Sequence, residues 1–251
     1  MDGDALFQFL LRLGDNNLIL GHRVSEWCGH APVLEEDIAM ANVALDLIGQ
    51  TQLWLALAAE VEGKGRDADK LAYLRDAGDF HNVLLVERPN GDFGHTLMRQ
   101  FLYDAWHLPA LNALQTSSDS RIGEIAEKAA KEVAYHLERS TDMVVRLGDG
   151  TEESHRRMQA ALDDLWPYSG EAFIADAVDE AAAAAGVAPL PETLKPAWDE
   201  HVAATLAEAT LDKPEQDFMH KGGKRGVHSE HLGYILAEMQ FLQRAYPGAR
   251  W

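Results

Sequence analysis

The sequence is poor in cysteine and in basic residues, and both shortages exclude classes of protein. Cys28 is the only cysteine in 251 residues, so neither an intrachain disulfide nor a cysteine-based zinc finger can form. Lysine and arginine number 22 against 41 aspartates and glutamates, which gives a formal net charge of −19. Proteins that bind nucleic acids or dock on anionic membranes carry basic patches. We therefore expect neither a nucleic acid nor a membrane among the partners of this chain.

Long hydrophobic runs are also missing from the sequence. No apolar run approaches the roughly 18 residues that a membrane-spanning helix needs. The first residues, Met1-Asp2-Gly3-Asp4, are acidic, whereas a secretory signal peptide begins with basic residues. These features predict a cytoplasmic location.

β-Branched residues are scarce, and this shortage indicates the fold class. Valine, isoleucine and threonine together supply 28 residues, whereas alanine and leucine supply 37 and 32. Alanine and leucine favour helices, and β-branched residues favour strands. Hydrophobic residues make up 47% of the chain, which is enough for a substantial core. The composition therefore predicts an all-α protein.

Apolar residues recur at helical spacing in long blocks that end at glycine- and proline-containing turns. This pattern predicts four long helices, at about residues 4–26, 33–61, 92–115 and 120–147. Shorter helices are expected within 67–91, 151–185, 192–211 and 229–245, with a loop at 212–228. Such an order is typical of a four-helix bundle with additional shorter C-terminal helices. Because no linker or repeat divides the chain, we expect a single helical domain over residues 1–251.

Two of the long helices carry a carboxylate in the middle of an apolar face. Asp46 lies in the apolar stripe of 33–61, and Asp104 lies in that of 92–115. Glu26 ends one side of the first helix, and His136 lies near the edge of the stripe on the fourth. A buried carboxylate needs a cation, a hydrogen-bonding partner or a raised pKa. Inward carboxylates and histidines on four bundle helices are typical of di-iron carboxylate proteins.

The full ligand pattern of a di-iron centre is not met in this sequence. That centre takes one carboxylate from each of two helices and a Glu-x-x-His pair from each of the other two. Gly49 stands three residues after Asp46, where a histidine is needed. Val133 stands three residues before His136, where a carboxylate is needed. The pattern alone leaves two interpretations open, a metal-free polar network and a metal centre with an unusual ligand set.

Several motifs, running from near residue 10 to the end of the chain, resemble one known family. They are Leu13-Gly14-Asp15-Asn16, Glu26-Trp27-Cys28-Gly29-His30-Ala31-Pro32, Leu45-Asp46-Leu47-Ile48-Gly49-Gln50, Asp104-Ala105-Trp106-His107, Lys131-Glu132 with Tyr135-His136-Leu137, Gly222-Gly223-Lys224, His228 with Glu230-His231-Leu232-Gly233, Ala237-Glu238-Met239-Gln240 with Leu242-Gln243-Arg244, and Trp251. With these motifs the chain resembles the PaaC-type C subunits of the bacterial ring-1,2-phenylacetyl-CoA epoxidases, a ferritin-like family.

The resemblance implies a non-catalytic structural subunit of a multicomponent oxygenase that acts in aerobic phenylacetate degradation. It implies pairing with a paralogous catalytic A subunit that carries the di-iron centre, so that no cofactor is expected in this chain. A small B subunit and a flavin and iron–sulfur reductase are further expected partners, with phenylacetyl-CoA near the subunit interface. The alternatives are an active di-iron oxygenase with an unusual ligand set and a free-standing helical binding protein.

The resemblance also assigns the candidate site residues by position, with no residue expected to be catalytic or to bind a metal. Four side chains fall where the catalytic paralogue has iron ligands, and two further positions fall where its remaining ligands are lost. The retained positions are Glu26, Asp46, Asp104 and His136, and the lost ones are Gly49 and Val133.

A glycine-rich loop at 213–228 concentrates positive charge in this acidic chain. Lys221, Lys224 and Arg225 stand there among three glycines, whose backbone N–H groups can approach an anion closely. The spacing is not that of a P-loop, so nucleotide hydrolysis is not indicated. One interpretation is a structural loop whose cations pair with acidic groups of this chain or of a partner. The other is a loop near the subunit interface that helps to hold the phosphates of a coenzyme A thioester.

Overall fold

The computed structural model describes residues 1–249 and divides them into two compact units. Unit 1 combines Met1–Pro89 with the segment that begins at Gly222, and unit 2 comprises Asn90–Lys221. Within residues 1–249 all regular secondary structure is helical, which confirms the predicted all-α class. None of the helices in this range is long and apolar enough to cross a membrane. Trp251, which ends the family-like motifs, lies outside the described residues.

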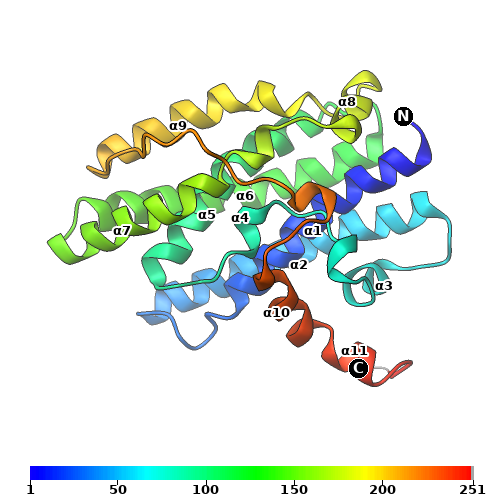
Figure 1. Cartoon of the computed structure of the whole chain (residues 1–251), viewed down its shortest axis with the longest axis horizontal. Helices are drawn as coiled ribbons and strands as arrows, with labels where there is room; N and C mark the ends of the chain where they lie inside the picture. Colours follow the sequence, from blue (N-terminus) through cyan, green and yellow to red (C-terminus); the bar gives the residue numbers. More distant parts are fainter. Residues whose placement is uncertain (250–251) are drawn as a thin grey trace. The chain divides into compact units, whose positions relative to one another are not determined.

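Unit 1 is built on two long helices, α1 (Gly3–Ser25) and α2 (Leu34–Glu62), which lie side by side (Figure 1). Gly14 of α1 faces Leu55 of α2, and Gly21 faces Leu47, so the two helices run antiparallel. The missing side chain at Gly14 allows a close approach, because a Cβ there would lie 2.6 Å from Leu55 Cδ2. Both helices match the predicted ranges to within one or two residues.

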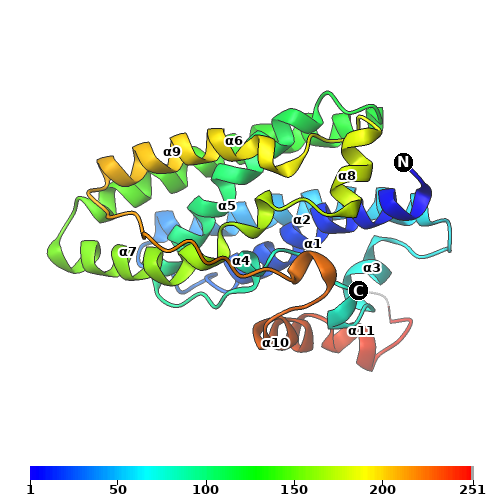
Figure 2. The same ribbon diagram turned by 45° about the horizontal axis from the view of Figure 1, so that its top comes forward.

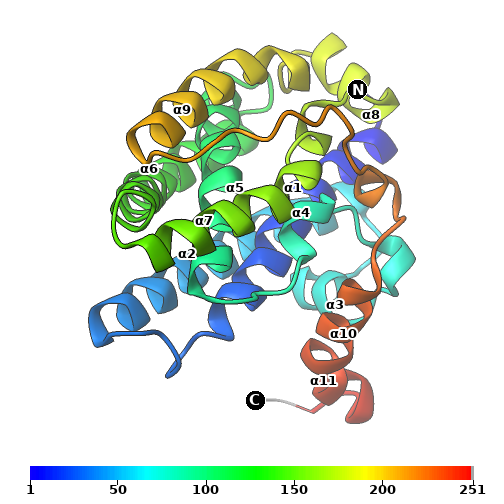
Figure 3. The same ribbon diagram turned by 60° about the vertical axis from the view of Figure 1, so that its left-hand side comes forward.

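The remaining elements of unit 1 are short. They are α3 (Ala68–Tyr73), η1 (Ala77–Asp79), α4 (Leu84–Glu87), η5 (Gly223–Arg225), α10 (Glu230–Met239) and α11 (Phe241–Ala245). The prediction of one continuous helix at 229–245 is wrong, because the helix is interrupted at Gln240. The buried Gln240 side chain donates hydrogen bonds to the carbonyls of Ala72 and Arg75, at 3.1 and 3.0 Å. These bonds attach α10 and α11 to the chain around α3 (Figure 3).

Unit 2 is built on a second antiparallel pair, α5 (Phe93–Leu114) and α6 (Ser120–Gly148) (Figure 2). Two further helices, α7 (Glu152–Leu165) and α9 (Lys195–Glu208), pack against both members of this pair. Trp198 joins α9 to α5, since its Nε1 donates to the carbonyl of Leu102 at 3.0 Å. The short elements of the unit are η2 (Trp166–Tyr168), η3 (Glu171–Phe173), α8 (Ala177–Ala184) and η4 (Pro191–Leu194).

The carboxylate of Glu87, fully buried at the end of α4, holds the C-terminal segment against the rest of unit 1. Its Oε1 accepts hydrogen bonds from the backbone N and Oγ of Ser229, both at 2.7 Å. Its Oε2 accepts from Asn82 Nδ2 at 3.0 Å and lies 2.8 Å from His228 Nδ1. The backbone carbonyl of Glu87 accepts from Arg23 Nη2 at 3.0 Å. One residue therefore joins α1, α4 and the C-terminal segment.

His228 completes this contact from both sides of its ring, because its Nε2 lies 2.8 Å from the carbonyl of Phe80. Burial lowers the pKa of His228, but the hydrogen bond to Glu87 and the charge of Glu87 raise it more, and the net pKa is raised. The stability that protonated His228 contributes is fully present below the ordinary histidine pKa of about 6.5. It is lost as the pH rises through the raised value.

The backbone of the loop before His228 packs directly against the backbone of η1 and of the residues before α4. A Cβ added at Gly223 would lie 2.1 Å from the carbonyl oxygen of Asn82. Gly226 has a φ of 76°, and a Cβ there would lie 2.3 Å from the carbonyl oxygen of Gly78. The glycines of this loop are therefore explained by close packing of two backbones.

Gly223→Ala should lower the free energy of unfolding by roughly 1–3 kcal/mol, because the added methyl group overlaps a backbone oxygen that cannot move aside cheaply. Gly233→Ala in α10 is the matched control, since nothing lies within 4 Å of a Cβ at that position. It should leave stability unchanged or raise it by up to about 1 kcal/mol. Urea unfolding measures both, and equal stabilities of the two variants would contradict this packing.

Glu87→Gln removes the charge that raises the pKa of His228, so the pKa of this histidine should fall below that of the wild type. Burial of the ring, which lowers the pKa, is retained in this variant. NMR titration of the His228 ring protons measures the change. Glu127→Gln, at an exposed pair with Lys131, is the control and should leave the titration where it was.

Candidate functional site

Asp104 on α5 is fully buried, and both of its carboxyl oxygens accept hydrogen bonds from unit 2. Gln100 Nε2 donates to Oδ1 at 2.6 Å, and Ser140 Oγ of α6 donates to Oδ2 at 2.9 Å. Burial raises the pKa of Asp104 to about 8, although these two hydrogen bonds and the charge of Arg139 lower it. The carboxyl group is therefore mostly neutral at pH 7. Protonation removes the buried charge, and the carboxyl group contacts an amide and a hydroxyl group.

Two buried histidines lie in the same unit, His107 on α5 and His136 on α6. Burial, and to a lesser extent the charge of His136, lower the pKa of His107 to about 3, so His107 is a neutral imidazole. Its Nδ1 has no hydrogen-bond partner among the described residues. The rings of Tyr103 and Trp106 surround it, with centroid distances of 4.9 and 6.0 Å. His107 thus lies in an aromatic environment.

Gln100 and Ser140, the two hydrogen-bond partners of Asp104, are residues that the sequence pattern did not single out. Gln100 precedes Asp104 by four residues, so helical spacing alone could have placed it on the same face. Ser140 on α6 contacts Asp104 on α5, and nothing in the sequence near either residue indicates that contact.

Unit 1 contains the other candidate positions. Glu26 follows the last residue of α1, and its side chain is 40% exposed. Arg23 Nη1 lies 3.1 Å from Glu26 Oε1, which is the kind of cationic contact expected for at least one of the carboxylates. Asp46 is half-buried on α2. Gly49 contributes no side chain, and a Cβ there would meet nothing within 4 Å.

The residues at the candidate positions do not fit a di-iron centre. Gly49 and Val133 supply no ligand atom, and Val133 is fully buried in the apolar core. Glu26 is held in an ion pair at the protein surface, and Asp104 already accepts two hydrogen bonds from neutral donors. Within residues 1–249 no group of three or more histidine, cysteine, aspartate or glutamate side chains is arranged to hold a metal ion.

The cationic loop is divided by the boundary between the units, with Lys221 in unit 2 and both Lys224 and Arg225 in unit 1. Lys221 and Arg225 are exposed, whereas Lys224 is buried. The backbone carbonyl of Lys224 accepts a hydrogen bond from Arg12 Nη2 at 3.4 Å and lies 3.2 Å from His81 Nδ1. These contacts involve the backbone of Lys224 and not its charged group.

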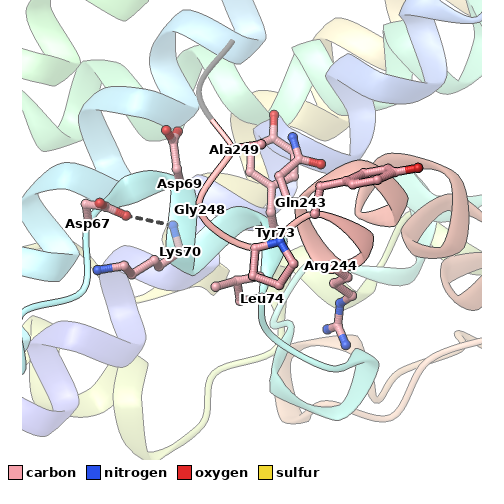
Figure 4. A pocket seen from close by; sticks show the side chains of 11 residues that line it. Asp67, Asp69, Lys70, Tyr73, Leu74, Gln243, Arg244, Gly248 and Ala249 are labelled. Carbon is pink, nitrogen blue, oxygen red and sulfur yellow. Dashed lines mark hydrogen bonds between the residues drawn. The ribbon is translucent and has the colours of Figure 1, made fainter.

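A groove of about 650 Å³ lies in unit 1 between α3 and the C-terminal segment (Figure 4). Tyr73, Leu74 and Tyr246 supply aromatic and apolar surface, and Lys70 and Arg244 supply positive charge. Asp67 lies at one end of the groove and caps α3 by accepting from the backbone N of Lys70 at 2.8 Å.

The all-helical structure of the described residues is consistent with the ferritin-like class of helical proteins. The whole chain, residues 1–251, matches the family described as phenylacetic acid catabolic protein. It is 49% identical over 248 residues to the C subunit of 1,2-phenylacetyl-CoA epoxidase from Escherichia coli strain K12. This match covers 99% of the chain and 100% of the relative. The chain belongs to the phenylacetic acid catabolic protein family, which confirms the resemblance found in its motifs.

Asp104→Asn should raise the free energy of unfolding at pH 7 by an amount on the order of a few kcal/mol. The folded protein keeps the Asp104 proton up to about pH 8, whereas the unfolded chain releases it near pH 4. The stability of the wild type should therefore fall as the pH rises between these values. The variant has no proton to lose, so this part of the fall should disappear.

Urea unfolding at several pH values between 4 and 8 measures this effect. Asp142→Asn, at an exposed pair with Arg146, is the control and should follow the wild type. A variant at Asp104 that is less stable than the wild type at every pH would show that the carboxylate is ionised and favourably paired.

Proposed function

We propose that this chain is the C subunit of a multicomponent 1,2-phenylacetyl-CoA epoxidase. In that complex it is a non-catalytic structural subunit that pairs with and supports the paralogous catalytic A subunit during phenylacetate degradation. The observation that carries the proposal is the 49% identity to the Escherichia coli protein, which extends over the full length of that relative. The small B subunit and the reductase are further proposed partners in the cytoplasm.

The chemistry of the candidate site supports a non-catalytic role. A di-iron oxygenase needs carboxylates and histidines that converge on two metal ions. In this chain Gly49 and Val133 supply no donor atom, and Asp104 is a neutral acid bound by an amide and a hydroxyl group. We therefore propose that the di-iron centre and the epoxidation belong to the A subunit, with phenylacetyl-CoA bound near the interface.

The proposal predicts that this chain restores growth on phenylacetate to an Escherichia coli strain that lacks its own C subunit. It also predicts that the purified chain, expressed in iron-supplemented cells, contains almost no iron, while stoichiometric iron is found in its complex with the A subunit. Asp104→Asn should support growth as well as the wild type, because the proposed role needs no acid at this position.

Stoichiometric iron in the chain alone, lost in the Asp104→Asn variant, would contradict the non-catalytic role and favour an active di-iron oxygenase. A chain that neither restores growth nor binds the A subunit would contradict membership of the complex. That result would favour a free-standing binding protein.

A further inference from the structure

One face of α2 exposes a row of large apolar side chains. Leu34, Ile38 and Leu45 are spaced by four and seven residues, so they share one helical face. Their exposed fractions are 71%, 53% and 68%. A single exposed leucine is ordinary, but a contiguous exposed apolar patch indicates a binding surface. We call the face that contains these three residues the α2 stripe.

The core of the chain does not require these side chains. Other faces of α2 already supply buried residues, including Met40, Val43, Leu47 and Trp54. Polar side chains would therefore be tolerated at the three positions of the stripe if α2 had only to pack within this chain. Apolar residues on all sides of a helix are expected where it is covered on all sides.

The shape of the stripe suits a second helix. Ala41 and Gly49 lie between or beside the large residues, and Ala56 continues the same face toward the end of α2. Nothing lies within 4 Å of a Cβ at Gly49, so there is open space beside the helix at that point. Alternating large and small residues form the ridges and grooves into which another helix packs. Leu34 to Leu45 span about 17 Å along the helix axis, and the exposed Gln52 follows on the same face.

The charge of α2 indicates which kind of helix fits. The helix carries six carboxylates and no lysine, arginine or histidine. Glu35 and Glu60 lie along one border of the stripe, and Asp37 lies along the other. A second copy of this chain would bring two sets of like charges together, which is unfavourable. A partner with basic residues beside its own apolar face would be complementary.

We infer that the α2 stripe is the surface through which this chain binds a helix of a different subunit, one whose apolar face is bordered by lysine and arginine. The identity of that partner as the A subunit rests on the proposed function. Leu45, at the C-terminal end of the row and 68% exposed, is expected to be a principal contact.

The test measures the affinity of the purified full-length chain for the A subunit by titration calorimetry. Leu45→Arg and Ile38→Arg should each weaken binding by about 30-fold or more, because each places a cation where an apolar contact formed. Tyr234→Arg is the matched control, since Tyr234 is a large apolar residue, 66% exposed, on α10. Its affinity should stay within a factor of about three of the wild type.

A second variant tests the charge argument without altering the apolar row. Glu35→Lys should slow association with the A subunit. Low salt should speed the association of the wild type and slow that of this variant. Asp142→Lys, on α6, is its control and should keep the salt dependence of the wild type. Circular dichroism and urea unfolding of each variant verify that it is folded.

The outcomes separate the surface from the proposed function. A complex that forms with equal affinity in all variants overturns the α2 stripe and leaves the proposed function intact. A self-associated wild-type chain that Leu45→Arg makes monomeric overturns the choice of a different subunit. A wild-type chain that stays monomeric and does not bind the A subunit overturns both.

Discussion

In unit 1, the hydrogen bonds of the buried Glu87 carboxylate join parts of the chain that are far apart in sequence, and the attachment of the C-terminal segment depends on them. A buried charge must be surrounded by donors. Glu87 meets this need with Asn82, His228 and Ser229, which fixes the C-terminal segment against α4. The buried ion pair of Arg75 with Asp15 acts in the same way between α1 and the end of α3. Apolar packing joins α1 to α2, and polar contacts decide where the later segments attach.

Unit 2 also buries a carboxyl group, but the hydrogen-bond partners of that group are of a different kind. Asp104 is as deeply buried as Glu87, but its hydrogen bonds come from an amide and a hydroxyl group and not from a histidine. Burial raises its pKa to about 8 despite these hydrogen bonds, and the acid remains protonated near neutral pH. Two equally buried carboxyl groups therefore have different partners, a histidine, a serine and an asparagine at Glu87 and an amide and a hydroxyl group at Asp104.

The sequence allowed the long helices, the all-α class and the family to be predicted, because apolar periodicity and motifs are local signals. It did not allow the break at Gln240 to be predicted, since the cause is a pair of carbonyl groups near residue 75. The role of Glu87 could not be predicted for the same reason, because its partners His228 and Ser229 are 141 and 142 residues away in the sequence. Helical spacing placed Glu26 on an inner face, but α1 ends one residue before it and the side chain turns outward.

Gly49 has open space beside it, whereas Val133 is closely packed, so the two positions differ in which side chains they can accept. A larger side chain at residue 49 meets no neighbour within 4 Å and would gain helix propensity over glycine. A carboxylate at residue 133 would enter a fully buried apolar site and would itself need a proton or a cation. A carboxyl group is therefore tolerated more easily at residue 49 than at residue 133.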